Sequence, residues 1–172
     1  MDEKRTSWFN RGFEKVVVGV NIAATAWIFV MIVLVVLDVA GRVLLNFPLT
    51  GTPEIIKISL PAITFLQMGY VLMIEAHIRS SVILARVSPR KAVILNIVAA
   101  VMGIWVFAIN FYAGWDLTVT AWAVGEYEGE GALRVPTAPI RTIIMFGSVI
   151  MIIQFVRIIF GYSRQLKAFS KR

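Results

Sequence analysis

Four long apolar blocks constrain this chain more than any other feature of its sequence. They cover about residues 16–37, 55–74, 92–115 and 138–161. A helix rises about 1.5 Å per residue, so the first block reaches roughly 33 Å, enough to cross the hydrocarbon core of a bilayer. The chain is also 59% hydrophobic, which exceeds what one small soluble core requires. The blocks therefore predict an all-α integral membrane protein with four transmembrane helices, forming one domain over residues 1–172.

The side chains that catalytic and cofactor sites commonly need are scarce. There is no cysteine, which excludes disulfides, thiolate metal sites and iron–sulfur clusters. The one histidine, His77, cannot supply a bis-histidine haem or a metal site. Zinc-protease and phosphate-loop motifs are absent. We therefore expect no cofactor and no enzymatic activity. A stand-alone four-span membrane enzyme or electron carrier is the alternative, and a haem band in the visible spectrum would favour it.

The net charge is +7, and the distribution of the basic residues indicates membrane topology and not a nucleic-acid-binding surface. Basic residues gather in the N-terminal arm, in the loop between the second and third blocks, and in the C-terminal tail. The two remaining loops contain only Arg42 and Arg134. Because cytoplasmic loops carry an excess of lysine and arginine, both termini are expected on the cytoplasmic side. The gathered residues are Lys4, Arg5, Arg11, Lys15, Arg79, Arg86, Arg90, Lys91, Arg164, Lys167, Lys171 and Arg172.

Two segments beside the blocks have the composition of helices that lie on a membrane surface. In the N-terminal arm, Trp8, Phe9 and Phe13 alternate with basic residues, which suits an interfacial helix or, equally, a disordered basic tail. Residues 117–124 form an apolar stretch that suits the outer surface. Residues 125–131 are so rich in glycine and glutamate that they predict a solvated loop. Calcium binding there is a weaker alternative, because the EF-hand spacing is absent.

Charged residues at the ends of the blocks occur as pairs with helical spacing. The pairs are Asp38 with Arg42, Glu54 with Lys57, and Glu75 with Arg79, the last with His77 between them. Each pair is compatible with an ion pair within one helix, with the long side chains reaching toward water. Each is also compatible with a fixed contact to another helix or subunit. Snorkelling is favoured for Lys57, whereas both interpretations stay open for Asp38 and Glu54, which flank the same loop.

Polar residues inside the blocks are mostly amides. Asn21, Gln67, Asn96, Asn110 and Gln154 are expected to form hydrogen bonds between helices. The middle thirds of the four blocks are nearly free of ionisable residues, and the chain has no internal repeat or charged midplane. A transporter that works alone needs such features. We therefore expect that this chain does not carry a solute by itself.

Several short motifs follow one another in a fixed order. Residues 37–48 contain Asp38, Gly41 and Arg42, residues 53–57 contain Glu54 and Lys57, and Phe65 follows. The later motifs are residues 75–79, Ser88-Pro89, Trp115, Gly125-Glu126, Pro136 and Pro139. In this order and spacing, from Val16 to Tyr162, the chain resembles the DctQ-type small membrane subunit of tripartite ATP-independent periplasmic (TRAP) transporters.

The resemblance implies a non-catalytic scaffold in a bacterial inner membrane. Subunits of this type bind a large DctM-type membrane subunit that carries the substrate and sodium sites and moves as an elevator. A periplasmic solute-binding protein delivers an organic acid to the outer face. The matching positions are expected to be subunit contacts or structural polar anchors. They are Asp38, Arg42, Glu54, Lys57, Glu75, His77, Arg79, Trp115, Glu126, Pro136 and Pro139.

Overall fold

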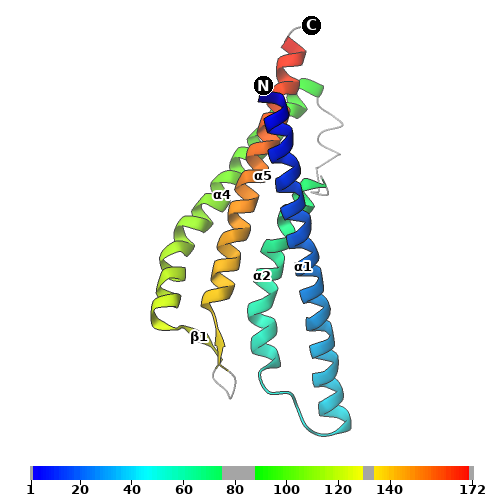
Figure 1. Cartoon of the computed structure of the whole chain (residues 1–172), viewed down its shortest axis with the longest axis vertical. Coiled ribbons are helices and arrows are strands. Elements are labelled where there is room, and N and C mark those ends of the chain that lie inside the picture. The colour runs from blue at the N-terminus through cyan, green and yellow to red at the C-terminus, as the bar shows by residue number, and fades with distance from the viewer. Residues whose placement is uncertain (1, 75–87, 130–133, 171–172) are drawn as a thin grey trace.

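The computed structural model describes residues 2–74, 88–129 and 134–170. Within these residues, four helices are long and apolar enough to cross a membrane. They are α1 (Asp2–Leu44), α2 (Thr52–Met73), α4 (Pro89–Val124) and α5 (Ala138–Ser170). This confirms the all-α four-span fold predicted from the apolar blocks. Both termini lie at the same end of the molecule (Figure 1), as an even number of spans requires. We call this the terminal end and the opposite one the loop end.

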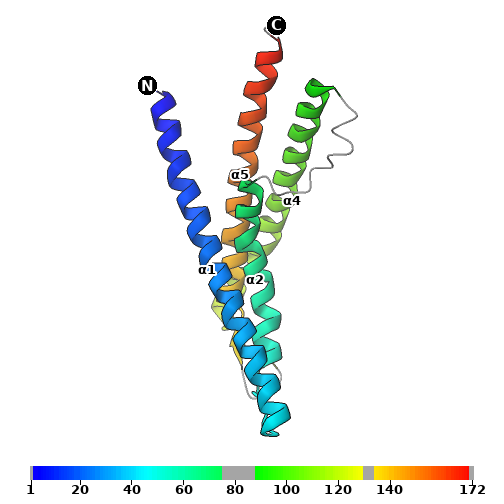
Figure 2. The ribbon, with the colours of Figure 1, turned by 90° about the vertical axis from the view of Figure 1, so that its right-hand side faces the viewer.

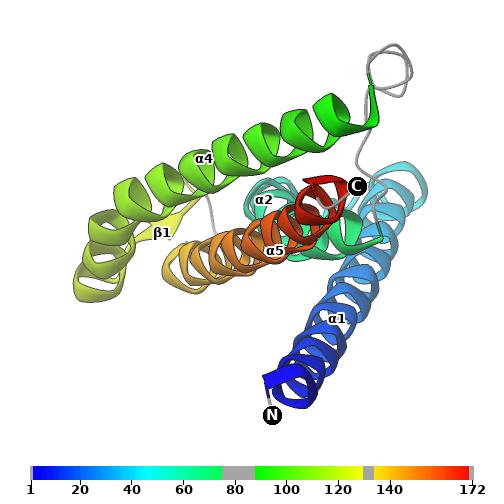
Figure 3. The same ribbon diagram turned by 90° about the horizontal axis from the view of Figure 1, so that it is seen from above.

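The helices are arranged as an open row. Helix α5 packs on α4 and on α2, and α2 packs in turn on α1. Seen along the long axis, α4 and α1 lie on opposite sides of α5 and α2 (Figure 3). Toward the terminal end, α1 leans away from α5 (Figure 2). Burial follows this order, because 33% of the most apolar stretch is buried in α2 and in α5, against 6% in α1 and 11% in α4. The two outer helices therefore present most of the apolar surface.

Small residues allow α2 and α5 to approach closely in the middle of the row. Gly147 of α5 lies against Phe65 of α2, so that a Cβ atom there would be 2.8 Å from the Phe65 carbonyl oxygen. One turn further along, Gly69 of α2 lies against Ile150. Lipid tails are as apolar as the helices, so close packing of small residues is a main source of helix association in membranes. The α2–α5 contact is therefore the centre of the fold.

Two helices are longer than the apolar blocks. Helix α1 begins at Asp2 and continues into its span without a break. Helix α4 likewise includes residues 117–124 and ends at Val124, where Gly125 follows with a left-handed φ of 65°. No proline interrupts either stretch, so the chain has no local signal to end the helix early. Neither segment forms the separate interfacial helix expected from its composition.

A small hairpin connects α4 to α5. Strand β1 (Tyr127–Glu128) pairs antiparallel with β2 (Val135–Pro136), with Tyr127 opposite Pro136 and Glu128 opposite Val135. The prediction of a loop throughout residues 125–131 is therefore wrong for Tyr127 and Glu128. The pairing is reinforced where the Thr137 backbone N–H donates to the Glu126 carbonyl at 3.0 Å. A short hairpin of this kind depends on contacts between its strands, which composition does not reveal.

Candidate functional site

Asp38 ties the α1–α2 connection to the end of α1. Its Oδ2 accepts a hydrogen bond from Arg42 Nε at 2.9 Å, and its Oδ1 accepts one from the Leu49 backbone N–H at 2.9 Å. Thr52 Oγ1 then donates to the Leu49 carbonyl at 3.1 Å, which joins the connection to the first turn of α2. Asp38 is buried, whereas the Arg42 side chain is half exposed. The i,i+4 pair that the spacing allows is formed, and Asp38 additionally fixes the connection that leads into α2.

Glu54 and Lys57 do not form the pair that their i,i+3 spacing suggested. Lys57 Nζ instead donates to Glu128 Oε1 of β1, from a largely exposed position. Within the described residues the Glu54 side chain has no hydrogen bond or ion pair, and its Oε2 is buried. Of the two interpretations left open for this pair, the ion pair within α2 is not formed, because Lys57 contacts a residue 71 positions later in the chain. Local spacing could not show that the hairpin lies beside α2.

Glu126 links the hairpin to the first turns of α5. Its Oε1 accepts a hydrogen bond from Arg141 Nη2 at 2.6 Å, and its carbonyl accepts one from Thr137 Oγ1 at 3.2 Å. Nearby, Trp122 Nε1 of α4 donates to Thr142 Oγ1 of α5 at 3.0 Å. Glu126 was expected to belong to a solvated acidic loop. In the structure it is a partly buried connector between α4 and α5.

The remaining predicted positions at the loop end have simpler surroundings. Trp115 is 54% exposed on α4, with its ring 5.8 Å from that of Phe111. Pro136 lies in β2, and Pro139 lies in the first turn of α5, where a helix tolerates proline. Glu75, His77 and Arg79 lie outside the described residues, and their expected pairing stays a prediction.

At the terminal end, Arg157 joins α5 to α1 and organises a buried amide. Arg157 Nη2 donates to Glu14 Oε1 at 2.6 Å, and Nη1 donates to Gln154 Oε1 at 3.1 Å. The guanidinium carbon also lies 5.1 Å from the centre of the Phe13 ring. Gln154 in turn donates from Nε2 to the Gly69 carbonyl of α2 at 3.2 Å. This contact was not predicted, although the opposite charges of Glu14 and Arg157 near corresponding ends of the first and fourth blocks were a usable signal.

Replacing Arg157 with alanine is expected to lower the free energy of unfolding by about 1–3 kcal/mol, because the buried Gln154 Oε1 loses its donor. Arg157→Lys should restore only part of the loss, since an ammonium cannot serve two acceptors in the same fork. Glu14→Gln should cost less, because the Glu14 side chain is 47% exposed. Thermal melting in detergent would measure all three. If the double variant lost the sum of the single losses within about 0.5 kcal/mol, the two residues would not be coupled.

The five amides divide into paired and unpaired groups. Gln154 bonds the Gly69 carbonyl, Ser148 Oγ donates to Asn110 Oδ1 at 3.1 Å, and Gln67 Nε2 lies 3.5 Å from Thr25 Oγ1. These contacts connect α5 to α2, α5 to α4, and α2 to α1, as expected for helix-joining amides. The side-chain amides of Asn21 and Asn96 have no hydrogen-bond partner in the described part of the chain.

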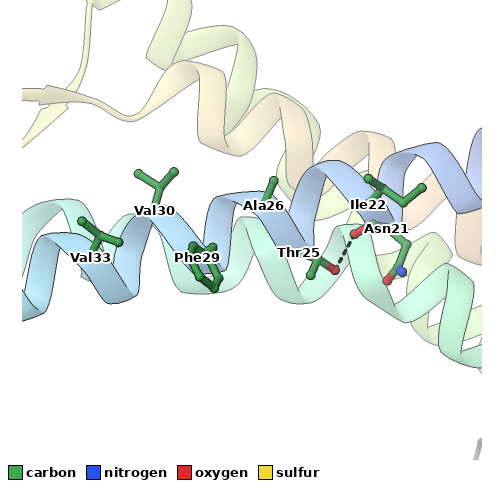
Figure 4. Close-up of a pocket in the computed structure, with 7 residues that line it drawn as sticks. All are labelled: Asn21, Ile22, Thr25, Ala26, Phe29, Val30 and Val33. Atoms are coloured by element: carbon green, nitrogen blue, oxygen red, sulfur yellow. Dashed lines mark hydrogen bonds between the residues drawn. The ribbon is translucent and has the colours of Figure 1, made fainter.

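A groove of about 770 Å³ follows the exposed side of α1 (Figure 4). We call it the α1 groove. It is lined by Asn21, Ile22, Thr25, Ala26, Phe29, Val30 and Val33. Thr25 Oγ1 donates to the Asn21 backbone carbonyl at 2.8 Å and accepts from Gln67 Nε2 at 3.5 Å. The groove thus combines an apolar floor with one unpaired amide at its edge.

These features define the class of protein. Among the described residues, no group of three or more histidine, aspartate and glutamate side chains could hold a metal ion. Four apolar helices, held together by polar contacts near their ends, make the chain a multi-pass integral membrane protein.

The family described as "Tripartite ATP-independent periplasmic transporters, DctQ component" matches residues 31–164. Because the match covers most of the chain, the chain belongs to this family, as its motifs indicated. The family is a component of a transporter that also has a large subunit and a binding protein, and it is not an enzyme family. No curated protein and no solved structure matches the chain.

Proposed function

We propose that this chain is the scaffold subunit for a large, elevator-type membrane subunit in sodium-coupled uptake of an organic acid. A periplasmic solute-binding protein would deliver the acid, and the complex would lie in a bacterial inner membrane. The observation that supports this proposal is the distribution of charge. The middle thirds of the four apolar blocks contain no aspartate, glutamate, lysine, arginine or histidine. Outside them, Asp38, Lys57, Glu126 and Arg157 fasten segments of this chain to one another. A scaffold subunit must keep its shape while the large subunit moves, and contacts of this kind between its own segments would make it rigid.

Co-purification tests the proposal that the chain binds a large subunit. When a tagged form of the chain is co-expressed with the DctM-type subunit of the same transporter, we expect both to elute as one complex in mild detergent. The tagged chain expressed alone provides the control for nonspecific aggregation. Elution of the two proteins as separate species would contradict the proposal.

The proposed orientation places the loop end in the periplasm and both termini in the cytoplasm. The chain has no cysteine, so a single introduced cysteine reports on one position without background. Thr50→Cys lies in the exposed α1–α2 connection at the loop end. Ser88→Cys lies exposed at the start of α4, at the terminal end. In intact spheroplasts, a membrane-impermeant maleimide should label the first variant and should label the second only after lysis. Labelling in the reverse order would overturn the orientation.

A further inference from the structure

The charged side chains of this chain are distributed very unevenly between its two ends. The segments toward the terminal end, residues 1–15, 74–91 and 157–172, contain thirteen basic and four acidic residues, a net charge of +9. The segments toward the loop end, residues 38–57 and 116–141, contain four basic and six acidic residues, a net charge of −2. Even if each acid near the terminal end paired with one base, nine basic residues would remain there that no carboxylate side chain of that end could neutralise.

The basic residues at the two ends also differ in their surroundings. At the loop end, Arg42, Lys57 and Arg141 each form an ion pair with a carboxylate of this chain. At the terminal end, Arg157 is paired in the same way with Glu14. We give the name basic collar to five further residues of the terminal end, which are exposed and have no ion-pair partner in the described part of the chain. They are Lys15, Arg90, Lys91, Arg164 and Lys167.

The basic collar lies at the depth of the phospholipid headgroups. Lys15, Lys91 and Arg164 lie about 12 to 15 residues from the middle of their apolar blocks, or roughly 18–22 Å along the helix. The hydrocarbon core of a bilayer ends about 15 Å from its midplane, and the headgroups extend to about 22 Å. Long basic side chains at this depth can reach the phosphate groups of the lipids.

The basic collar surrounds the row of helices and is not confined to one side of it. Lys15 is on α1, Arg90 and Lys91 are on α4, and Arg164 and Lys167 are on α5. Toward the terminal end these three helices fan apart (Figure 2), with α1 and α4 on opposite sides of α5 (Figure 3). A protein partner that covers one side of the row would reach only part of the collar, whereas lipid headgroups are present on every side.

We propose that the basic collar binds the headgroups of anionic phospholipids through their phosphate groups. Arginine and lysine both bind phosphate by charge-assisted hydrogen bonds. A zwitterionic headgroup carries its own ammonium group beside the phosphate, so it would leave the excess charge of the collar without a counterion. This inference goes beyond the proposed function, because it concerns the contact of the chain with lipid and requires no large subunit.

Lipid binding to the purified chain tests the proposal. The chain is melted in an uncharged detergent with phosphatidylglycerol, phosphatidylcholine or inorganic phosphate at equal phosphate concentration, and native mass spectrometry counts the lipids that stay bound. We expect phosphatidylglycerol to stay bound and to raise the melting temperature, and the other two to have a much smaller effect. Equal effects of the two lipids would overturn the proposal. An equal effect of inorganic phosphate would also overturn it, because the collar would then bind a free anion.

Substitutions in the collar show which residues carry the binding. Lys15→Gln, Lys91→Gln and Arg164→Gln should each weaken phosphatidylglycerol binding about fivefold, the effect of one basic residue beside an anionic surface, and their combination about a hundredfold. The matched control keeps the charge, as Lys15→Arg, Lys91→Arg and Arg164→Lys together, and should retain most of the binding. Melting without lipid checks that the variants fold, and the single variants decide if the combination does not. Undiminished binding by the glutamine variants would contradict the proposal.

The complex with the large subunit separates this inference from the proposed function. The triple glutamine variant should co-purify with the large subunit as the unaltered chain does. Loss of the large subunit with undiminished phosphatidylglycerol binding would assign the collar to the partner and overturn the inference. If the unaltered chain itself does not co-purify with the large subunit, the scaffold role fails and the binding of lipid by the collar is unaffected.

Discussion

Replacing Gly147 with leucine is expected to separate α2 from α5 and to cause the largest loss of stability of any single change considered. A Cβ atom at this position would lie 2.8 Å from the Phe65 carbonyl oxygen and 3.0 Å from its carbonyl carbon. Backbone atoms cannot move aside as the end of a flexible side chain can. Because the two helices must shift as bodies, we expect a loss at the upper end of the overpacking range, about 3 kcal/mol.

The same substitution elsewhere on α5 provides the control. Gly161 has no atom within 4 Å of where its Cβ would lie, and it is exposed near the terminal end. Gly161→Leu should therefore leave thermal melting in detergent unchanged or slightly improved, since leucine favours helix more than glycine does. Equal melting temperatures for the two variants would show that α2 and α5 are not in close contact at Gly147.

The four spans could be predicted from the sequence because hydrocarbon imposes a simple requirement of length and apolarity. The order of the helices could not. Helices that are apolar on every side carry no periodic signal that selects one face for a neighbour. The central contact depends on Gly147 and Gly69, whose role is visible only when the opposing helix is in place. Hydropathy likewise located the spans but not the extension of α1 to Asp2 and of α4 to Val124.

The candidate polar contacts divide in a similar way. The Asp38–Arg42 pair is local, and its i,i+4 spacing was sufficient to indicate it as one of two interpretations. The pairs Lys57–Glu128 and Glu14–Arg157 join residues 71 and 143 positions apart, so only the fold brings them together. The pair of Glu54 and Lys57 shows the same limit, because the spacing left a local ion pair and a distant contact equally possible and only the fold selects the distant one. Contacts between elements are governed by packing, which a single sequence encodes only indirectly.

Transport of the solute should require both membrane subunits, so that leaving out either one should abolish uptake. The spans of this chain hold no ionisable group in their middle thirds, and among its described residues no metal-binding cluster occurs. A solute anion and its coupling cation therefore find no charged side chain in the middle thirds of the four apolar blocks, where transporters commonly hold them. We therefore expect that the chain alone does not move solute and that the large subunit needs this chain as its scaffold.

Reconstitution into proteoliposomes measures this directly. Vesicles would contain this chain, the large subunit or both, with an inward sodium gradient and with the solute-binding protein loaded with its labelled organic acid outside. We expect uptake only from vesicles that contain both membrane subunits, and none above empty vesicles from either subunit alone. Collapse of the sodium gradient should abolish the uptake. Accumulation of the labelled acid by vesicles that contain this chain without the large subunit would contradict the scaffold role.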